Sequence, residues 1–321
     1  MARTSYTDNL SISGKLTDLK QRVLFVIFGV IIYRFGAYIP IPGVNPELLE
    51  KFFHNQSSSL FGLFNMFSGG ALYRFSIFSL GIMPYISASI IMQILSSVSP
   101  TLEELKKSGE AGRNKIMSYT RYATFVLALV QSFGISRYIA SNGLSFVSPW
   151  QFYCISVLTL TAGSVFLMWL GEQITERGIG NGVSLLIFAS IISGLPRAIF
   201  HTIEQARNGN LSIVVMLLVF LTVIGVVAFV IFFERAQRKI PVYYANRQYS
   251  GKNSNSYSSH LPLKINMAGV IPAIFATSIL VLPSTLSTWF ASYHHMGWLS
   301  LVSLYLSYGQ PLYVVLFVVA V

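Results

Sequence analysis

The chain has 321 residues, of which 53% are hydrophobic and only 10% charged, and its net charge is +11. A soluble globular protein carries about 25% charged residues, so this composition excludes an ordinary soluble domain and indicates a membrane protein with several spanning helices. The single cysteine, Cys154, excludes a disulfide within one chain and a structural zinc site, which needs several converging ligands.

Long apolar runs predict the spanning helices in chain order. A helix needs about 20 mostly apolar residues to cross the hydrocarbon layer. Seven runs meet this requirement: 23–39, 75–95, 123–139, 152–170, 183–200, 211–233 and 265–282. They are continuous rather than alternating, which favours helices over barrel strands. An eighth run begins at Leu312 and reaches only Val321, so we expect seven complete spans and the start of an eighth in a C-terminally truncated form.

The basic residues predict the orientation. Most of the 22 Lys and Arg residues lie in four of the segments between or before spans: 1–22, 96–121, 171–182 and 234–264. These segments share one side of the membrane if the N-terminus is cytoplasmic. Because cytoplasmic loops carry an excess of Lys and Arg, we predict a cytoplasmic N-terminus.

Missing acids and bases narrow the function. The two aspartates, Asp8 and Asp18, precede the first span, which excludes an intramembrane aspartyl protease. The predicted helix centres hold no acid, whereas ion-coupled transporters place ionisable groups within their spans. We therefore expect a passive pathway that is not an enzyme, uses no cofactor and takes its energy from a partner. A secondary transporter with broken helices stays an alternative.

Six segments resemble the signature sequences of one family. They are 38–43 (YIPIPG), 64–72 (FNMFSGGAL), 80–90 (LGIMPYISASI), 169–182 (WLGEQITERGIGNG), 260–275 (HLPLKINMAGVIPAIF) and 309–313 (GQPLY). In these segments the chain resembles the SecY/Sec61-alpha family, whose bacterial members form the channel of the Sec translocase. The resemblance implies an all-α helical bundle of the SecY type, truncated relative to ten spans, in the bacterial inner membrane.

The spacing of several isoleucines says little by itself, because Ile82 and Ile86, like Ile187 and Ile191, are an ordinary i and i+4 pair. The resemblance assigns them, together with Ile274, to a pore ring. A narrow aliphatic ring blocks ions because it dewets and offers nothing to replace their hydration water. It fits around a passing polypeptide without holding it.

The resemblance also implies a plug that seals the external side of the resting pore, in segment 60–72. Its candidate residues are Leu63, Phe64, Asn65, Met66, Phe67, Ser68, Gly69 and Gly70. Without the resemblance, the same segment is interpreted as an external amphipathic helix on the bilayer surface. Pro84 and Pro272 are expected to act as hinges in the helices of a lateral gate, because proline removes a helical hydrogen bond.

The predicted organisation has four parts. Residues 1–200 form an N-terminal half with spans one to five, 201–233 hold span six and the preceding loop, 234–264 form a basic cytoplasmic 6/7 loop, and 265–321 hold span seven, an external loop and the start of span eight. In the basic loop, the positive-inside effect or anionic lipid could explain the charge. The resemblance implies docking of partners through Arg235, Arg238, Lys239, Arg247 and Lys252.

The implied partners are the SecE and SecG subunits, the SecA ATPase, the ribosome through its RNA, signal peptides and nascent chains, SecDF, YidC and membrane lipids. The family implies passage of unfolded secretory proteins across the membrane and lateral release of membrane proteins into it. Because the chain stops inside a predicted span, a non-functional truncated subunit is a further alternative.

Overall fold

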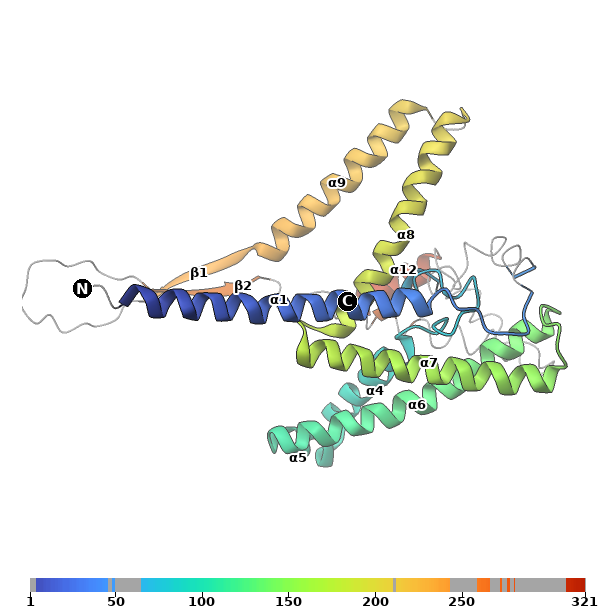
Figure 1. Cartoon of the computed structure of the whole chain (residues 1–321), viewed down its shortest axis with the longest axis horizontal. Coiled ribbons are helices and arrows are strands. Elements are labelled where there is room, and N and C mark those ends of the chain that lie inside the picture. Colours follow the sequence, from blue (N-terminus) through green and yellow to red (C-terminus); the bar gives the residue numbers. More distant parts are fainter. Residues whose placement is uncertain are drawn as a thin grey trace, which may run out of the picture. The chain divides into compact units, whose positions relative to one another are not determined.

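The computed structural model describes residues 4–45, 48–49, 65–209, 212–242, 259–265, 272, 276–277, 280 and 310–320. They belong to two compact units, of which one comprises Met1–Pro196 with Phe275–Val321 and the other Arg197–Ile274. The helices are α1 (Thr4–Gly36), α4 (Met83–Val98), α5 (Pro100–Lys107), α6 (Glu110–Ser141), α7 (Pro149–Arg177), α8 (Gly182–Arg207), α9 (Ile213–Arg235) and α12 (Pro311–Ala320). Two strands, β1 (Gln237–Val242) and β2 (Ser259–Lys264), complete the described elements (Figure 1).

The structure confirms the prediction of a helical membrane protein. Within the described ranges, α6, α7, α8 and α9 are long and apolar enough to cross a membrane, and α4 with α5 adds a fifth if this bent pair is one span. Most of the predicted seventh span lies outside the described residues. The count of seven spans and the truncation therefore stay predictions.

The second predicted span begins later than its apolar run. The run starts at Phe75, but residues 77–82 form turns and the helix α4 begins at Met83. Gly81 adopts a φ of +57°, a left-handed conformation that ends regular helix, and Pro84 occupies the first turn, where its missing N–H costs no hydrogen bond. Glycine and proline at these positions therefore override the apolar continuity of the sequence.

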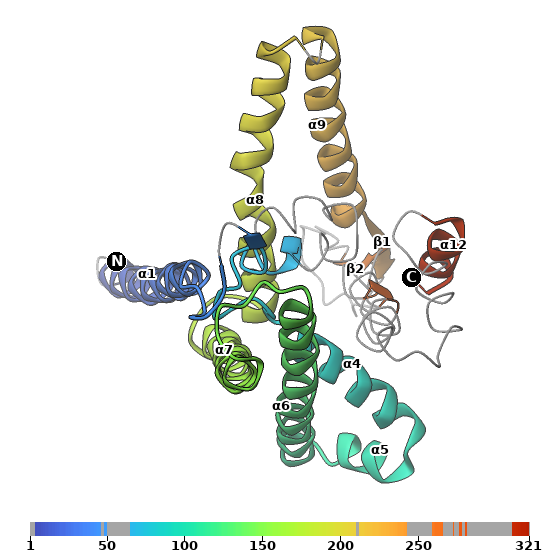
Figure 2. The same ribbon diagram turned by 90° about the vertical axis from the view of Figure 1, so that its right-hand side faces the viewer.

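Close contacts between helices build the core of the first unit. Helix α6 packs along α7 and α4, and α1 packs along α7 (Figure 2). Gly163 of α7 lies so close to the backbone carbonyl of Ile77 that an added Cβ would overlap with it. Across α6 and α7, the hydroxyls of Ser132 and Thr161 lie 3.1 Å apart. Small residues and interhelical hydrogen bonds replace the hydrophobic effect as the source of helix association in lipid.

Three loop segments gather at one end of α6 and α7. The backbone N–H of Ile41 donates to Phe75, and that of Asn45 donates to Leu144. The side chains of Ile41, Phe75 and Leu144 join a buried apolar cluster that includes Phe152 of α7 and Ile139 of α6. This cluster fixes the segment that follows α1 against the turns that precede α4.

The second unit contains α9 and a β-hairpin. None of the α9 side chains is buried, and the helix is apolar on every face, as expected for a helix surrounded by lipid or by other subunits. Strands β1 and β2 pair antiparallel, with Gln237 opposite Lys264 and Val242 opposite Ser259. The sequence predicted only a loop over 234–264 and not these strands, because the β-branched and alternating pattern is weak here.

Candidate functional site

The first two ring candidates, Ile82 and Ile86, lie at the start of α4. The backbone N–H of Ile86 donates to the carbonyl of Ile82 at 3.1 Å, so the two residues lie one helical turn apart. Both side chains are buried, with 5% and 6% of their surface exposed. Ile82 caps the helix rather than lying within it, since Met83 is the first helical residue.

The second pair lies on α8. Ile187 is half-buried and Ile191 is 40% exposed, one turn further along the helix. Both pairs belong to the first compact unit. Ile274 lies outside the described residues. The joint lining of a pore by these five residues therefore stays a prediction.

The plug candidates form a short, tightly turned segment. Leu63 and Phe64 lie outside the described residues, Asn65–Phe67 form one helical turn, and Ser68–Gly70 continue as a turn. The N–H of Gly70 donates to the carbonyl of Asn65 at 2.9 Å, and the N–H of Tyr73 donates to the Asn65 side-chain oxygen at 3.2 Å. Partial burial raises the pKa of the Tyr73 phenol above its ordinary value.

Polar side chains from two helices hold this segment. The Tyr33 hydroxyl of α1 lies 3.0 Å from the carbonyl oxygen of Ser68 and 2.6 Å from the Ser190 hydroxyl of α8. Arg34 donates from Nη1 to the carbonyl of Gly69 at 3.2 Å, and the Ser193 hydroxyl lies 3.4 Å from the same oxygen. None of these four residues was predicted from the sequence, although a tyrosine and an arginine inside an apolar run indicate a functional position.

Two arginines also flank an exposed tyrosine just after α1. The guanidinium carbon of Arg74 lies 4.1 Å from the ring centre of Tyr38, and that of Arg34 lies 5.6 Å from it. Both distances are within the range of cation–π attraction. Arg34 therefore connects the turn at Gly69 to the first residues of the loop after α1.

The hinge candidates differ from the expectation. Pro84 does not interrupt a helix, because it lies in the first turn of α4 and removes no helical hydrogen bond there. The premise of an internal kink at Pro84 is therefore wrong, and a hinge there would lie at the junction of turn and helix. Pro272 has helical backbone and is half-buried, but its neighbours are not described. Pro196, which the sequence analysis did not select, lies inside α8.

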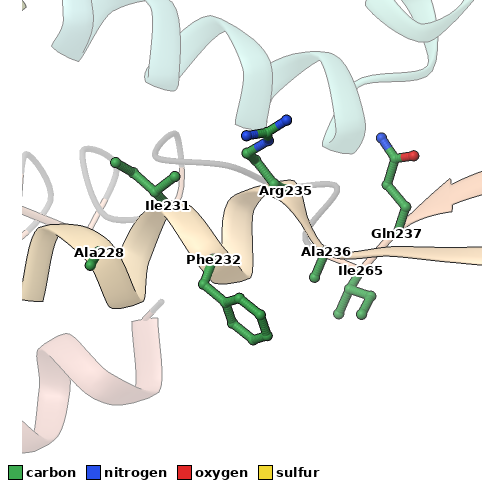
Figure 3. A pocket seen from close by; sticks show the side chains of 7 residues that line it. All are labelled: Ala228, Ile231, Phe232, Arg235, Ala236, Gln237 and Ile265. Atoms are coloured by element: carbon green, nitrogen blue, oxygen red, sulfur yellow. The ribbon is translucent and has the colours of Figure 1, made fainter.

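The basic candidates lie where α9 meets the hairpin. Arg235 occupies the last turn of α9, and Arg238 and Lys239 follow on β1 with exposed side chains. Arg247 and Lys252 lie outside the described residues. An open, mostly apolar hollow lies at this junction, lined by Ala228, Ile231, Phe232, Arg235, Ala236, Gln237 and Ile265 (Figure 3). In Figure 3 the Arg235 side chain points to the side of the helix opposite Phe232.

Comparison with known proteins identifies the family. The SecY family model matches residues 76–321. The chain is 53% identical to the protein translocase subunit SecY of Pseudomonas aeruginosa over 99% of its own length and 72% of the relative's. It is 54% identical to the Escherichia coli K12 protein of that name over 100% of its length and 73% of the relative's.

Solved structures show the same fold. A protein-conducting channel gives a TM-score of 0.58 at 16% identity over 85% of this chain, and Sec61 from a canine ribosome-channel complex gives 0.60 at 16% identity over the same share. The chain spans 59% of the length of each of these two structures. Identity and fold agree: the chain is a multi-pass membrane protein that belongs to the SecY family, a channel subunit of the protein translocase and not an enzyme.

Proposed function

We propose that this chain passes unfolded polypeptides across the inner membrane, and membrane proteins laterally into it, through an apolar constriction formed by Ile82, Ile86, Ile187, Ile191 and Ile274. The observation that carries the proposal is membership of the SecY family. It is supported by a segment that hydrogen bonds hold against α1 and α8, where Ser190 lies between Ile187 and Ile191 in the sequence. Aliphatic side chains bind no specific sequence, and an ion between them loses hydration that nothing replaces.

Segment 63–70 is proposed as the plug of the resting channel. In the structure its turn is seated on α1 and α8 through the carbonyls of Ser68 and Gly69. A solved SecY with the same fold, at 16% identity and a TM-score of 0.55, is described as having a plug domain that stabilises the closed state and maintains a membrane seal. The seated segment supports the same role here.

Lateral release is proposed to occur beside α4, with Pro84 and Pro272 near the moving parts. Since Pro84 lies in the first turn of α4 after a turned segment, a pivot there would strain only the hydrogen bonds that this first turn makes to Ile82. A nascent apolar helix that enters beside α4 would then exchange protein contacts for lipid.

The ion barrier is tested by Ile82→Gly and Ile191→Gly in the full-length channel, measured as conductance of resting channels in planar bilayers. Each substitution removes the aliphatic side chain, so water and ions should enter and the resting conductance should rise. Ile192→Gly is the matched control, because Ile192 neighbours Ile191 on α8 and is similarly exposed at 42%. Conductance equal to that of the control would contradict the assignment.

Partner docking is proposed at Arg235, Arg238, Lys239, Arg247 and Lys252. The Sec61 relative in a ribosome-channel complex supports a ribosome as one partner, through phosphate contacts to its RNA. SecA would use the same surface, and SecE, SecG, SecDF, YidC and lipids would contact the apolar helices. These basic residues face the cytoplasm, where such partners bind, only if the N-terminus is cytoplasmic.

Docking is tested by Arg238→Glu with Lys239→Glu. Both side chains are exposed and lie on opposite faces of β1, since neighbouring strand residues alternate. Reversal of two charges should weaken co-sedimentation with ribosomes about tenfold or more at physiological salt. Arg207→Glu is the control, because Arg207 is an exposed arginine at the C-terminal end of α8 and lies outside the hairpin. Equal binding by both variants would contradict the docking surface.

A further inference from the structure

The Ser68 carbonyl of the plug segment contacts a buried pair of hydroxyl groups, those of Tyr33 and Ser190. This pair makes more hydrogen-bond contacts than it has protons to donate. Tyr33, Ser68 and Ser190 are each at most 2% exposed. The Tyr33 hydroxyl reaches the Ser68 carbonyl at 3.0 Å and the Ser190 hydroxyl at 2.6 Å, while the Ser190 hydroxyl also reaches the Leu186 carbonyl at 2.8 Å. These two hydroxyls carry two protons for three contacts, so one contact is always without a donor.

Three proton arrangements are possible. One places both protons on carbonyls and leaves the two hydroxyl oxygens 2.6 Å apart with no proton between them, so it is disfavoured. The other two place a proton between the hydroxyls. In the first, Ser190 donates to Tyr33 and Tyr33 donates to the Ser68 carbonyl, which holds the plug segment. In the second, Tyr33 donates to Ser190 and Ser190 donates to the Leu186 carbonyl of its own helix. This frees the Ser68 carbonyl, while Arg34 still donates to the Gly69 carbonyl. Both hydroxyls have a full donor bond in each arrangement, so release leaves no buried donor unsatisfied.

Ser193 shows the same choice. Its hydroxyl lies 3.4 Å from the Gly69 carbonyl of the segment and 2.6 Å from the Ser190 carbonyl of α8. Gly69 fits this cradle because an added Cβ would lie 3.0 Å from Arg34 Nη1 and 3.2 Å from the Ser190 Cα, and its φ of +66° favours glycine. The helix therefore offers an internal acceptor to each hydroxyl that contacts the segment.

We infer that Tyr33, Ser190 and Ser193 form a two-state hydrogen-bond latch, which holds the plug segment through its backbone and returns its donors to α8 when the segment leaves. This inference rests on the proposed role of segment 63–70 as the plug. Ser190 lies on α8 between Ile187 and Ile191, so a polypeptide that displaces these isoleucines moves a member of the latch as well. Widening of the ring and release of the plug are thereby coupled through one helix turn.

The latch predicts opposite effects for two hydroxyl deletions. Tyr33→Phe removes the donor that holds Ser68 and keeps the ring, so it favours the released state by about twofold to tenfold. Ser190→Ala leaves the bond from Tyr33 to Ser68 but removes the acceptor that Tyr33 needs after release, so it favours the held state. A merely structural role of Ser190 in helix packing would loosen the segment instead.

The experiment measures exposure of a cysteine at position 68. Ser68→Cys is introduced into the full-length channel with Cys154→Ala, and a membrane-impermeant maleimide is applied to the external face of right-side-out vesicles. The labelling rate should rise about twofold to tenfold with Tyr33→Phe and should fall below the parent rate with Ser190→Ala. Tyr153→Phe is the matched control, since this half-buried tyrosine of α7 packs against Phe133 and Phe152.

Resting conductance of the same variants separates the latch from the plug. A labelling rate that Tyr33→Phe leaves unchanged, or that rises equally in Tyr33→Phe and Ser190→Ala, overturns the latch. Opposite changes in labelling support it. If these changes occur while Tyr33→Phe leaves resting conductance at the parent level, the latch stands and the assignment of the segment as the seal is wrong.

Discussion

At the scale of single residues, the account depends on a few isoleucines and on two hydroxyl groups, those of Tyr33 and Ser190, which lie 2.6 Å apart. Ile82, Ile86, Ile187 and Ile191 could be selected only through the family resemblance, because an i and i+4 pair of isoleucines is ordinary in a membrane helix. Tyr33 and Ser190 were not selected at all. Their importance depends on a contact between residues 157 positions apart in the chain, which no local pattern contains.

The close approach of Gly163 to Ile77 makes a prediction at this scale. Gly163→Ala would place a Cβ against the Ile77 carbonyl oxygen, so backbone must shift and the channel should lose about 1–3 kcal/mol of stability. Gly225→Ala on α9 is the control, because nothing lies within 4 Å of its added Cβ. The melting temperature in detergent should fall for the first variant and stay or rise for the second. Equal melting temperatures would show that α7 and the Ile77 turn are not tightly packed.

At the scale of elements, apolar periodicity predicted that helices exist but not where they end. Helix α7 continues to Arg177, seven residues beyond the end of the predicted span. Helix α4 begins eight residues after the first residue of its apolar run. Hydropathy measures preference for lipid, whereas a helix ends where glycine, proline or a capping side chain favours another backbone conformation. The turn before α8 shows this, since Asn181 accepts the N–H of Val183 at 3.0 Å through its side chain.

An ion pair between Arg121 of α6 and Glu172 of α7 joins these two helices. Arg121 Nε lies 2.9 Å from Glu172 Oε1, and Arg121 Nη2 lies 2.9 Å from Glu172 Oε2, so the pair is bidentate. The Glu172 side chain is 13% exposed and that of Arg121 is 45% exposed. A double-mutant cycle with Arg121→Ala and Glu172→Ala should give a coupling of about 1 kcal/mol in thermal stability.

The cycle has a matched control in Lys107 and Glu103, which pair within α5 and are 73% and 50% exposed. Their coupling should be about 0.3–0.5 kcal/mol, because solvent screens an exposed i,i+4 pair. A coupling between Arg121 and Glu172 no larger than this value would contradict a role in fixing α6 against α7.

For the whole molecule, composition and missing acids excluded soluble proteins and several enzyme classes, and the signature segments indicated the family that the comparisons show. The sequence did not reveal the hairpin formed by β1 and β2 or the seating of segment 65–70 on α1 and α8. Both depend on pairing between distant segments. The segment 234–264, predicted as a basic loop, therefore holds two strands that the prediction did not include.

The most direct test of an apolar constriction is site-specific crosslinking of a stalled secretory precursor in the full-length channel. A photoreactive residue is placed at position 82 or 191, with position 192 as the control on the same helix. We predict crosslinks from positions 82 and 191 that exceed those from position 192 severalfold. Crosslinks from 82 and 191 no stronger than those from 192, with the precursor demonstrably halted midway, would contradict passage between these isoleucines.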